Sequence, residues 1–379
     1  MNEKDLKIFP PSAKNIHWYG RNGKTGNATA LFWTASGFLV NTTAGELWAE
    51  LEADYGEQAI WVGVWVDGDL LSRFVLERTK RWYLLCSLTP GIKRNIELLK
   101  ETQAMAGDEK HSLLVHALGV PADFSAEPFL SPAPFRANIE FVGDSITTGE
   151  GLCGAKSEAD WNSSWISLRG SYALLTARAL NADFRFLSQS GWGVFSGWDN
   201  DRTCTLPPHY DSVCSVLNEN LNENCGAHLP NDFSAWKSDF VVVNLGTNDA
   251  NAFHSPAKTA SDGTVWKMHL DENGNPCKSD VALFLHAVTD FVAKIRTRNP
   301  QAQIIWAYGM CTHDFGDEIE KCLEDFAQKT GDTAISFVRL PAVSDSSDCD
   351  AVGSLNHPGR ATHKAASQAL LAHIFNLMK

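Results

Sequence analysis

The sequence predicts an N-terminal all-β sandwich followed by an α/β domain built on a parallel sheet. The chain has 379 residues, whereas one hydrophobic core usually serves about 250–300, so two domains are expected. Before about residue 120, short apolar runs are separated by turn residues, as in antiparallel sheets. Beyond about residue 135, continuous apolar runs alternate with amphipathic segments, which is typical of parallel strands covered by helices.

The expected strands of the first domain are rich in Val, Trp, Phe and Leu. They include Ala30–Thr34, Ala59–Val66, Leu70–Leu76, Trp82–Leu88 and His111–Leu118. Asp67 and Gly68 favour a hairpin turn between the second and third of these runs. The Pro-, Ala- and Ser-rich segment from Pro121 to Pro134 is typical of a domain boundary. We therefore predict a sandwich over residues 1–125, a linker over 126–136 and an α/β domain over 137–379.

The second domain is expected to alternate strands and helices. Its strand candidates are Ile139–Val142, Phe184–Leu187, Phe240–Leu245, Ile304–Tyr308 and Ile335–Leu340. Its helix candidates are Tyr172–Leu180, Val281–Arg298, Asp317–Lys329 and Ala361–Met378. In such folds the loops that follow the carboxyl ends of the strands build the functional site.

The charge balance excludes several classes of protein. The 45 acidic residues outnumber the 32 basic ones, for a net charge of −13, which argues against nucleic-acid binding and against a polybasic membrane-surface protein. No run of about 18 apolar residues occurs, and the N-terminus has no signal-peptide core. The nine cysteines form no CxxC pair. We therefore expect a soluble cytoplasmic chain, or a secreted one if a leader has been removed.

Ser145 is the first candidate for chemistry. It follows the strand that ends in Gly143 and Asp144, where α/β enzymes place reactive groups. The alternative is that Ser145 only caps a following helix. The motif is not the G-x-S-x-G elbow, because position 147 is Thr, so a different serine scaffold is required.

Three further blocks carry candidate residues. Asn248 lies after the strand Phe240–Leu245, and an Asn side chain there can donate to a developing oxyanion. Gly191 and Gly193 follow another strand, and glycine lets the backbone approach a ligand closely. His357 precedes Pro358 and the final helix.

The order and spacing of these four blocks resemble the SGNH (GDSL-type) hydrolases over residues 135–379. The resemblance implies a flavodoxin-like three-layer α/β/α fold. It also implies that Ser145 is the nucleophile and His357 the general base. The oxyanion hole would consist of the backbone N–H groups of Ser145 and Gly193 and the Asn248 side chain, with Gly191 as the alternative glycine.

A β-sandwich before an SGNH domain resembles carbohydrate esterase family 2, whose members join a jelly roll to the catalytic domain. The resemblance implies a serine esterase without a cofactor that removes acetyl groups from xylan, mannan or glucomannan, as polymers or oligosaccharides. Trp192 and Trp198 flank the glycine block, so they are candidates for lining the acyl or sugar site.

One position departs from the SGNH pattern. The family usually has Asp three residues before the histidine, and here that residue is Ser354. Either a backbone carbonyl orients His357 in a Ser–His dyad, which we favour, or the acid is Asp348 or Asp350.

Other readings of the function stay open. One is a metal-dependent deacetylase, although Cys311, His313 and Asp314 match no zinc spacing. The others are a non-catalytic carbohydrate-binding protein and an esterase or acyltransferase that acts on another short-chain acyl ester.

Overall fold

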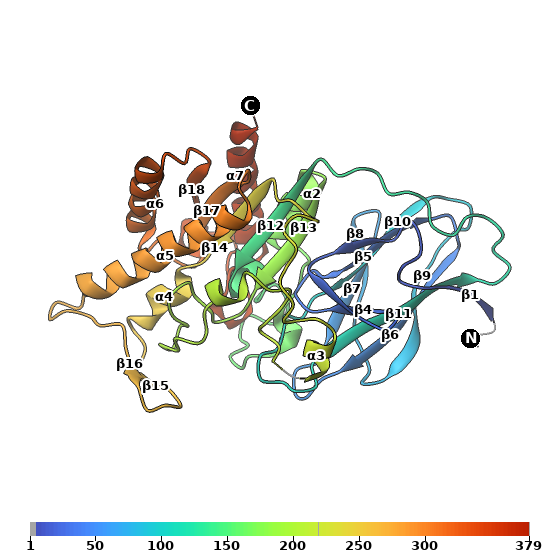
Figure 1. The fold of residues 1–379 in the computed structure, drawn as a ribbon, viewed down its shortest axis with the longest axis horizontal. Coiled ribbons are helices and arrows are strands. Elements are labelled where there is room, and N and C mark those ends of the chain that lie inside the picture. The colour runs from blue at the N-terminus through green and yellow to red at the C-terminus, as the bar shows by residue number, and fades with distance from the viewer. Residues whose placement is uncertain (1–4, 219, 379) are drawn as a thin grey trace. The chain divides into compact units, whose positions relative to one another are not determined.

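The computed structural model describes residues 5–218 and 220–378, which form two compact units (Figure 1). The first unit contains the residues up to Phe135 together with Asn162–Ser164 and Asp211–Asn231. The second contains Arg136–Trp161, Trp165–Tyr210 and the chain from Asp232 onward. This division differs from the predicted boundaries because it assigns two short segments of the later chain to the first unit.

The first unit is an antiparallel sandwich of two sheets, as expected. One sheet has the order β3-β4-β11-β6-β9, with β1 paired to β11, and the other has the order β2-β5-β10-β7-β8. The strands are β1 (Leu6–Phe9), β2 (His17–Tyr19), β3 (Asn22–Thr25), β4 (Ala28–Leu31), β5 (Gly37–Thr42), β6 (Glu46–Asp54), β7 (Trp61–Val66), β8 (Asp69–Val75), β9 (Lys80–Ser87), β10 (Arg94–Lys100) and β11 (Ser112–Pro121). The short helix α3 (Asn220–Asn224) also belongs to this unit.

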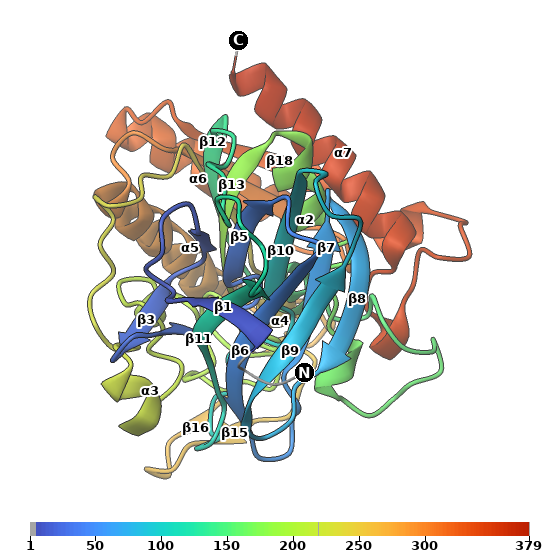
Figure 2. The same cartoon turned by 90° about the vertical axis from the view of Figure 1, so that its right-hand side faces the viewer.

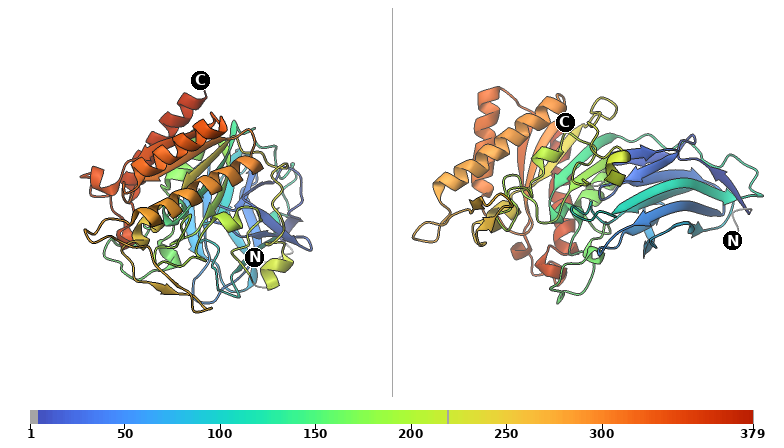
Figure 3. Two further views of the ribbon diagram at one scale, coloured as in Figure 1. Left: turned by 60° about the vertical axis from the view of Figure 1, so that its left-hand side comes forward. Right: turned by 60° about the horizontal axis from the view of Figure 1, so that its bottom comes forward.

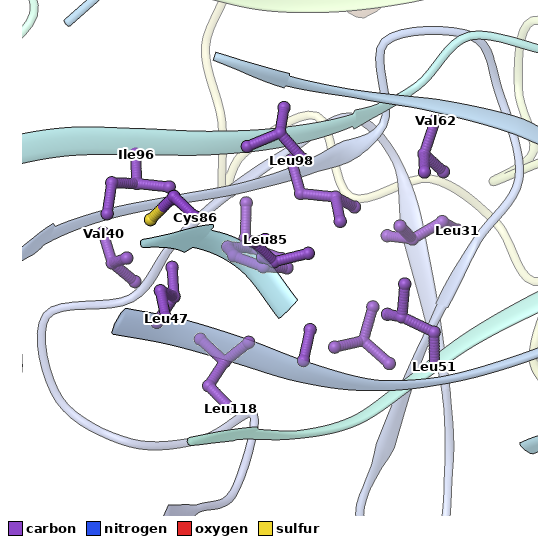
Figure 4. Packing of buried hydrophobic residues seen from close by; sticks show 14 of the residues in the cluster. Leu31, Val40, Leu47, Leu51, Val62, Leu85, Cys86, Ile96, Leu98 and Leu118 are labelled. Carbon is purple, nitrogen blue, oxygen red and sulfur yellow. The ribbon is translucent and has the colours of Figure 1, made fainter. Parts of the chain in front are cut away.

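The core of this sandwich is made of alternate side chains from both sheets, which Figure 4 shows from close by. In β6, Leu47 and Leu51 are fully buried, while the three glutamates on the opposite face of the strand are only partly covered. They meet Ile96 and Leu98 of β10 in one apolar cluster. Each large aliphatic side chain that is buried in this way contributes about 1.5–3 kcal/mol to stability.

The second unit is built on a parallel five-stranded sheet of order β13-β12-β14-β17-β18. The strands are β12 (Ala137–Gly143), β13 (Ala182–Ser188), β14 (Phe240–Asn244), β17 (Gln303–Gly309) and β18 (Ile335–Leu340). All five residues of β14 are buried, as expected for a strand that is covered on both faces. The predicted mixed architecture, a parallel α/β sheet after an antiparallel sandwich, is thus confirmed.

Helices cover both faces of the parallel sheet. The long helices are α2 (Tyr172–Ala179), α5 (Lys278–Arg298), α6 (Gly316–Thr330) and α7 (Arg360–Leu377). Helix α2 packs against α7, and α5 packs against α6. The two pairs lie on opposite sides of the strands in Figure 2, and Figure 3 shows them from two further directions. Within residues 5–218 and 220–378, no helix combines the length and the apolar character needed to cross a bilayer.

The strand order creates a switch point at β12. The chain runs from β12 to β13 on one side and later returns to β14 on the other side, so the loops after these strands diverge. In open α/β sheets, ligands bind where neighbouring connections part in this way. The helices α1 (Ser145–Thr148) and α4 (Thr247–Ala252) begin at this edge, directly after β12 and β14.

Candidate active site

Ser145 is the first residue of α1, immediately beyond β12. The Asp144 side chain caps this helix by accepting the N–H of Ile146 at 2.9 Å. The Ser145 hydroxyl lies 2.9 Å from Nε2 of His357, although the two residues are 212 positions apart in the chain. The fold therefore brings together the serine and the histidine that the sequence analysis singled out.

His357 is oriented by its own backbone turn. Nδ1 of the imidazole lies 3.1 Å from the carbonyl oxygen of Leu355. Leu355 and Asn356 both have left-handed φ angles, 54° and 57°, which fold this carbonyl back toward the ring. Such conformations cost non-glycine residues about 1–3 kcal/mol each and concentrate at functional sites. A proton on Nδ1 can be donated to Leu355, which leaves Nε2 free to accept from Ser145.

The position where the SGNH pattern has Asp holds a structural serine. Ser354 is fully buried, and its hydroxyl donates to the carbonyl of Cys153 at 2.7 Å. The two alternative acids, Asp348 and Asp350, are both exposed. The Asp348 carboxylate accepts the backbone N–H of Asp350 at 2.8 Å. Within the described chain, neither carboxylate contacts His357. The geometry therefore favours the backbone carbonyl of Leu355 as the group that orients the ring.

Asn248 reaches the site from the start of α4. Gly246 precedes the helix with a φ of 123°, a conformation that favours glycine, and a methyl group there would lie 2.9 Å from the Tyr308 ring. The Asn248 amide nitrogen donates to the carbonyl of Trp192 at 2.9 Å and makes a longer contact of 3.3 Å with the Asp144 carboxyl. The shorter bond holds the side chain in place, and the longer one is at the weak end of the hydrogen-bond range.

The hydrogen bonding of Gly193 does not fit its expected role as a donor in the oxyanion hole. The N–H of Gly193 already donates to the carbonyl of Cys204 at 3.2 Å, so it is not free to bind an oxyanion. Gly193 is required for packing instead, because a methyl group there would lie 2.4 Å from the Asp249 carboxylate. Gly191 has a φ of 80°, and among the described residues no acceptor takes its N–H. Gly191 is therefore the better candidate donor.

Asp249 is a residue whose role the sequence analysis did not assign. Its carboxylate accepts the backbone N–H groups of Val194, Phe195 and Ser196 at 2.7–3.0 Å. It therefore holds the loop that follows the glycine block. Burial raises the pKa of Asp249 to about 6, although these three bonds oppose the rise. Burial also raises the pKa of Asp144 to about 7, and the neighbouring carboxylates of Asp249 and Glu150 add to this rise.

Aromatic side chains lie beside the glycine block. The Trp198 side chain is 53% exposed, and a methyl group on Gly191 would lie 3.1 Å from its indole ring. The Trp192 ring is half-buried and lies 5.1 Å from the His209 ring, while its carbonyl holds Asn248. The structure thus places both predicted tryptophans next to candidate oxyanion donors.

Of the three residues considered for a metal, His313 has another partner. His313 lies 3.0 Å from the Asp345 carboxylate through its Nε2. Over the described part of the chain, no three or more His, Cys, Asp or Glu side chains are grouped so that they could hold a metal ion.

Comparison with known proteins identifies the class to which this site belongs. The model of the GDSL-like lipase/acylhydrolase family matches residues 141–365, and the chain belongs to this family. The resemblance to the SGNH hydrolases is thereby confirmed.

Individual relatives point to carbohydrate esterases. A solved acetyl xylan esterase from the rumen bacterium Butyrivibrio proteoclasticus is 34% identical, covers 98% of both chains and superposes with a TM-score of 0.93. A family two carbohydrate esterase from Clostridium thermocellum, solved with cellohexaose, is 23% identical, covers 96% of this chain and 99% of its own, and has a TM-score of 0.76, which supports the shared fold. These neighbours confirm the predicted resemblance to carbohydrate esterase family 2.

Curated sequences agree with this grouping. Cellulase/esterase CelE of Acetivibrio thermocellus is 25% identical over 360 residues, which cover 92% of this chain. An acetylxylan esterase/glucomannan deacetylase of Cellvibrio japonicus is 30% identical over 230 residues, or 59% of this chain. The matches span only 38% and 54% of the lengths of these two relatives.

Proposed function

We propose that this chain is a serine esterase that removes O-acetyl groups from hemicellulose-derived polysaccharides or oligosaccharides. The observation that carries the proposal is the 2.9 Å contact between Ser145 and His357 at the switch point of the sheet. Similarity to the Butyrivibrio acetyl xylan esterase over 98% of the chain supports the substrate class.

In the first half-reaction, Ser145 attacks the acetyl carbonyl while Nε2 of His357 takes the hydroxyl proton. The bond from Nδ1–H to the Leu355 carbonyl keeps the imidazole in the tautomer that this transfer requires. His357 then returns the proton to the sugar oxygen as the bond between that oxygen and the acetyl carbon breaks. Water, deprotonated by the same nitrogen, hydrolyses the acetyl-enzyme and releases acetate.

The negative charge of the tetrahedral intermediate needs donors on one side of Ser145. We assign this role to the backbone N–H groups of Ser145 and Gly191 and to the amide of Asn248. The Ser145 N–H is at the start of α1, where helix geometry supplies no internal acceptor. The contact of the Asn248 amide with Asp144 is long, so this side of the amide can donate to the substrate oxygen while the shorter bond to the Trp192 carbonyl holds the side chain.

Trp198 and Trp192 are proposed to line the path of the saccharide. A flat exposed indole buries the apolar face of a sugar ring, and Trp198 is the more exposed of the two. The net charge of −13 suits a neutral glycan better than a polyanion.

The N-terminal sandwich is proposed to be a jelly roll. Support comes from the strand order, in which β4-β11-β6-β9 and β5-β10-β7-β8 share eight consecutive strands between two sheets. We also propose a cytoplasmic setting, in which the enzyme acts on imported oligosaccharides. All nine cysteines are free thiols, which is common in reducing compartments.

The test of the function uses acetylated xylan and glucomannan oligosaccharides. Incubation with the protein should remove acetyl signals from the NMR spectrum and release one acetate for each signal lost. The rate should be the same after treatment with a chelator. Activity that vanishes with the chelator and returns with zinc would contradict the serine mechanism, and release of acyl groups from other esters alone would contradict the substrate class.

A Ser145–His357 dyad without a third acidic residue predicts that the exposed acids Asp348 and Asp350 are dispensable for activity. Asp348→Ala and Asp350→Ala should each keep kcat for 4-nitrophenyl acetate within a few-fold of the wild type, because neither carboxylate touches His357. Loss of a triad Asp costs about 10⁴ in kcat elsewhere. A loss of that size in either variant would identify the missing acid and refute the dyad.

A further inference from the structure

We propose that Glu150 is a positioning residue of the esterase, and that its carboxylate supports the charged imidazole of His357 in place of the absent Asp. The inference rests on the proposed function of the Ser145–His357 pair. Glu150 lies in the turn after α1 and belongs to none of the four sequence blocks described above.

The geometry places this carboxylate at the reacting nitrogen. Oε1 of Glu150 lies 3.5 Å from Nε2 of His357, and the glutamate side chain is only 3% exposed. Its other oxygen, Oε2, is buried and has no hydrogen-bond partner among the described residues. The backbone N–H of Glu150 donates to the Ser145 carbonyl at 3.0 Å, so the turn is tied to the nucleophile itself.

The same turn also packs against the histidine loop. Gly151 has a φ of 87°, and a methyl group there would lie 2.5 Å from Cβ of His357. Its carbonyl accepts the N–H of Ser354 at 3.2 Å. Glu150 is therefore held between Ser145 and His357 by backbone contacts on both sides, which limits its freedom to move away.

A carboxylate at this position can stabilise the positive charge that His357 acquires during the reaction. A buried carboxylate is costly unless a positive charge or hydrogen bonds compensate it, and Oε2 has no bond that does so. The compensating charge appears when Nε2 takes the serine proton and the ring becomes an imidazolium. The attraction therefore strengthens in the transition state, which is the condition for it to accelerate the reaction. The Leu355 carbonyl orients the ring but supplies only a dipole.

The other titratable groups around His357 are less suited than Glu150 to support a charged imidazole. His363 of α7 accepts the Tyr172 N–H at 3.1 Å, and burial, followed by the influence of His357, lowers its pKa to about 3, so it stays neutral. Burial raises the pKa of Asp144 and of the Cys311 thiol, the latter to about 12. In the described chain, Glu150 is the one carboxylate within ion-pair distance of His357.

The test is the pH dependence of kcat/KM for 4-nitrophenyl acetate in Glu150→Gln. His357 must be neutral to act as a base, and a nearby negative charge favours its protonated form. Removal of that charge should move the acidic limb of the profile about one unit to lower pH. The plateau value should fall about tenfold. Glu150→Asp, whose carboxylate is one methylene further from the ring, should shift the limb less in the same direction.

A matched control removes a glutamate that has no role at the site. Glu324 lies on the exposed side of α6, and Glu324→Gln should leave both the limb and the plateau unchanged. An unshifted limb in Glu150→Gln, with only a lower plateau or melting temperature, would overturn the inference, and so would a shift to higher pH. If the Gln protein does not fold, the profile of Glu150→Asp decides in the same way. A wild-type protein without esterase activity would instead refute the proposed function.

Discussion

Ser145→Ala should abolish hydrolysis of acetylated saccharides. Loss of a serine nucleophile costs on the order of 10⁶ in kcat in serine proteases, and no other hydroxyl is bonded to Nε2 of His357 in the described chain. The variant removes one hydroxyl and one hydrogen bond, so the free energy of unfolding should change by about 1 kcal/mol or less. Initial rates with 4-nitrophenyl acetate, together with thermal melting, measure both effects.

Binding separates loss of chemistry from loss of structure. Ser145→Ala should bind acetylated oligosaccharide as tightly as the wild type in calorimetry, because the tryptophans and oxyanion donors stay in place. Turnover within a hundredfold of the wild-type rate would rule out Ser145 as the nucleophile. A non-catalytic carbohydrate-binding protein would show binding without turnover in the wild type as well.

Asn248→Ala should reduce kcat by about 10²–10³ and change KM little. A single oxyanion donor contributes about 2.7–4 kcal/mol to the barrier, and it acts when the charge develops rather than when the substrate binds. The measurement is steady-state kinetics with 4-nitrophenyl acetate and with an acetylated oligosaccharide. Both substrates should be affected alike, because the donor contacts the acetyl oxygen rather than the sugar.

The same helix provides a matched control for Asn248. Asn251 lies three residues later on α4 with an exposed side chain, so Asn251→Ala removes an amide without touching the site. It should keep kcat near the wild-type value. A rise in KM with unchanged kcat in Asn248→Ala would mean that Asn248 binds the ground state, which would contradict the proposed role of its amide in the oxyanion hole.

The α/β elements were predictable because each strand is a continuous apolar run. The expected strand Ile139–Val142 lies inside β12, and the expected Phe240–Leu245 overlaps β14 almost completely. In contrast, β6 is not distinctive in the sequence, because its Glu, Leu and Ala residues are good helix formers. It is a strand because pairing with β9 and β11 buries every second side chain. Local propensity is overridden there by the sandwich core.

The contact between Ser145 and His357, the pair proposed for catalysis, was also predictable, whereas the groups around this pair were not. Ser145 and His357 stand in blocks whose order is typical of the family, so they could be found without coordinates. Gly191 is preferred to Gly193 as the candidate donor because the Gly193 N–H already donates to the Cys204 carbonyl, which only the structure shows. Glu150 carries no signal of its own, since a glutamate after a four-residue helix is common and only folding shows that it is buried beside His357.

The sequence by itself determined the class of fold and the candidates for nucleophile, base and amide donor, because residue type and spacing along the chain carry that information. Only the tertiary structure decided how the base is oriented and which glycine is free. Those features depend on contacts across long separations, such as the 212 positions between Ser145 and His357, and on the left-handed turn at Leu355. A hydrogen bond requires a distance and a direction, and the chain acquires both when the loops after β12, β13 and β14 meet.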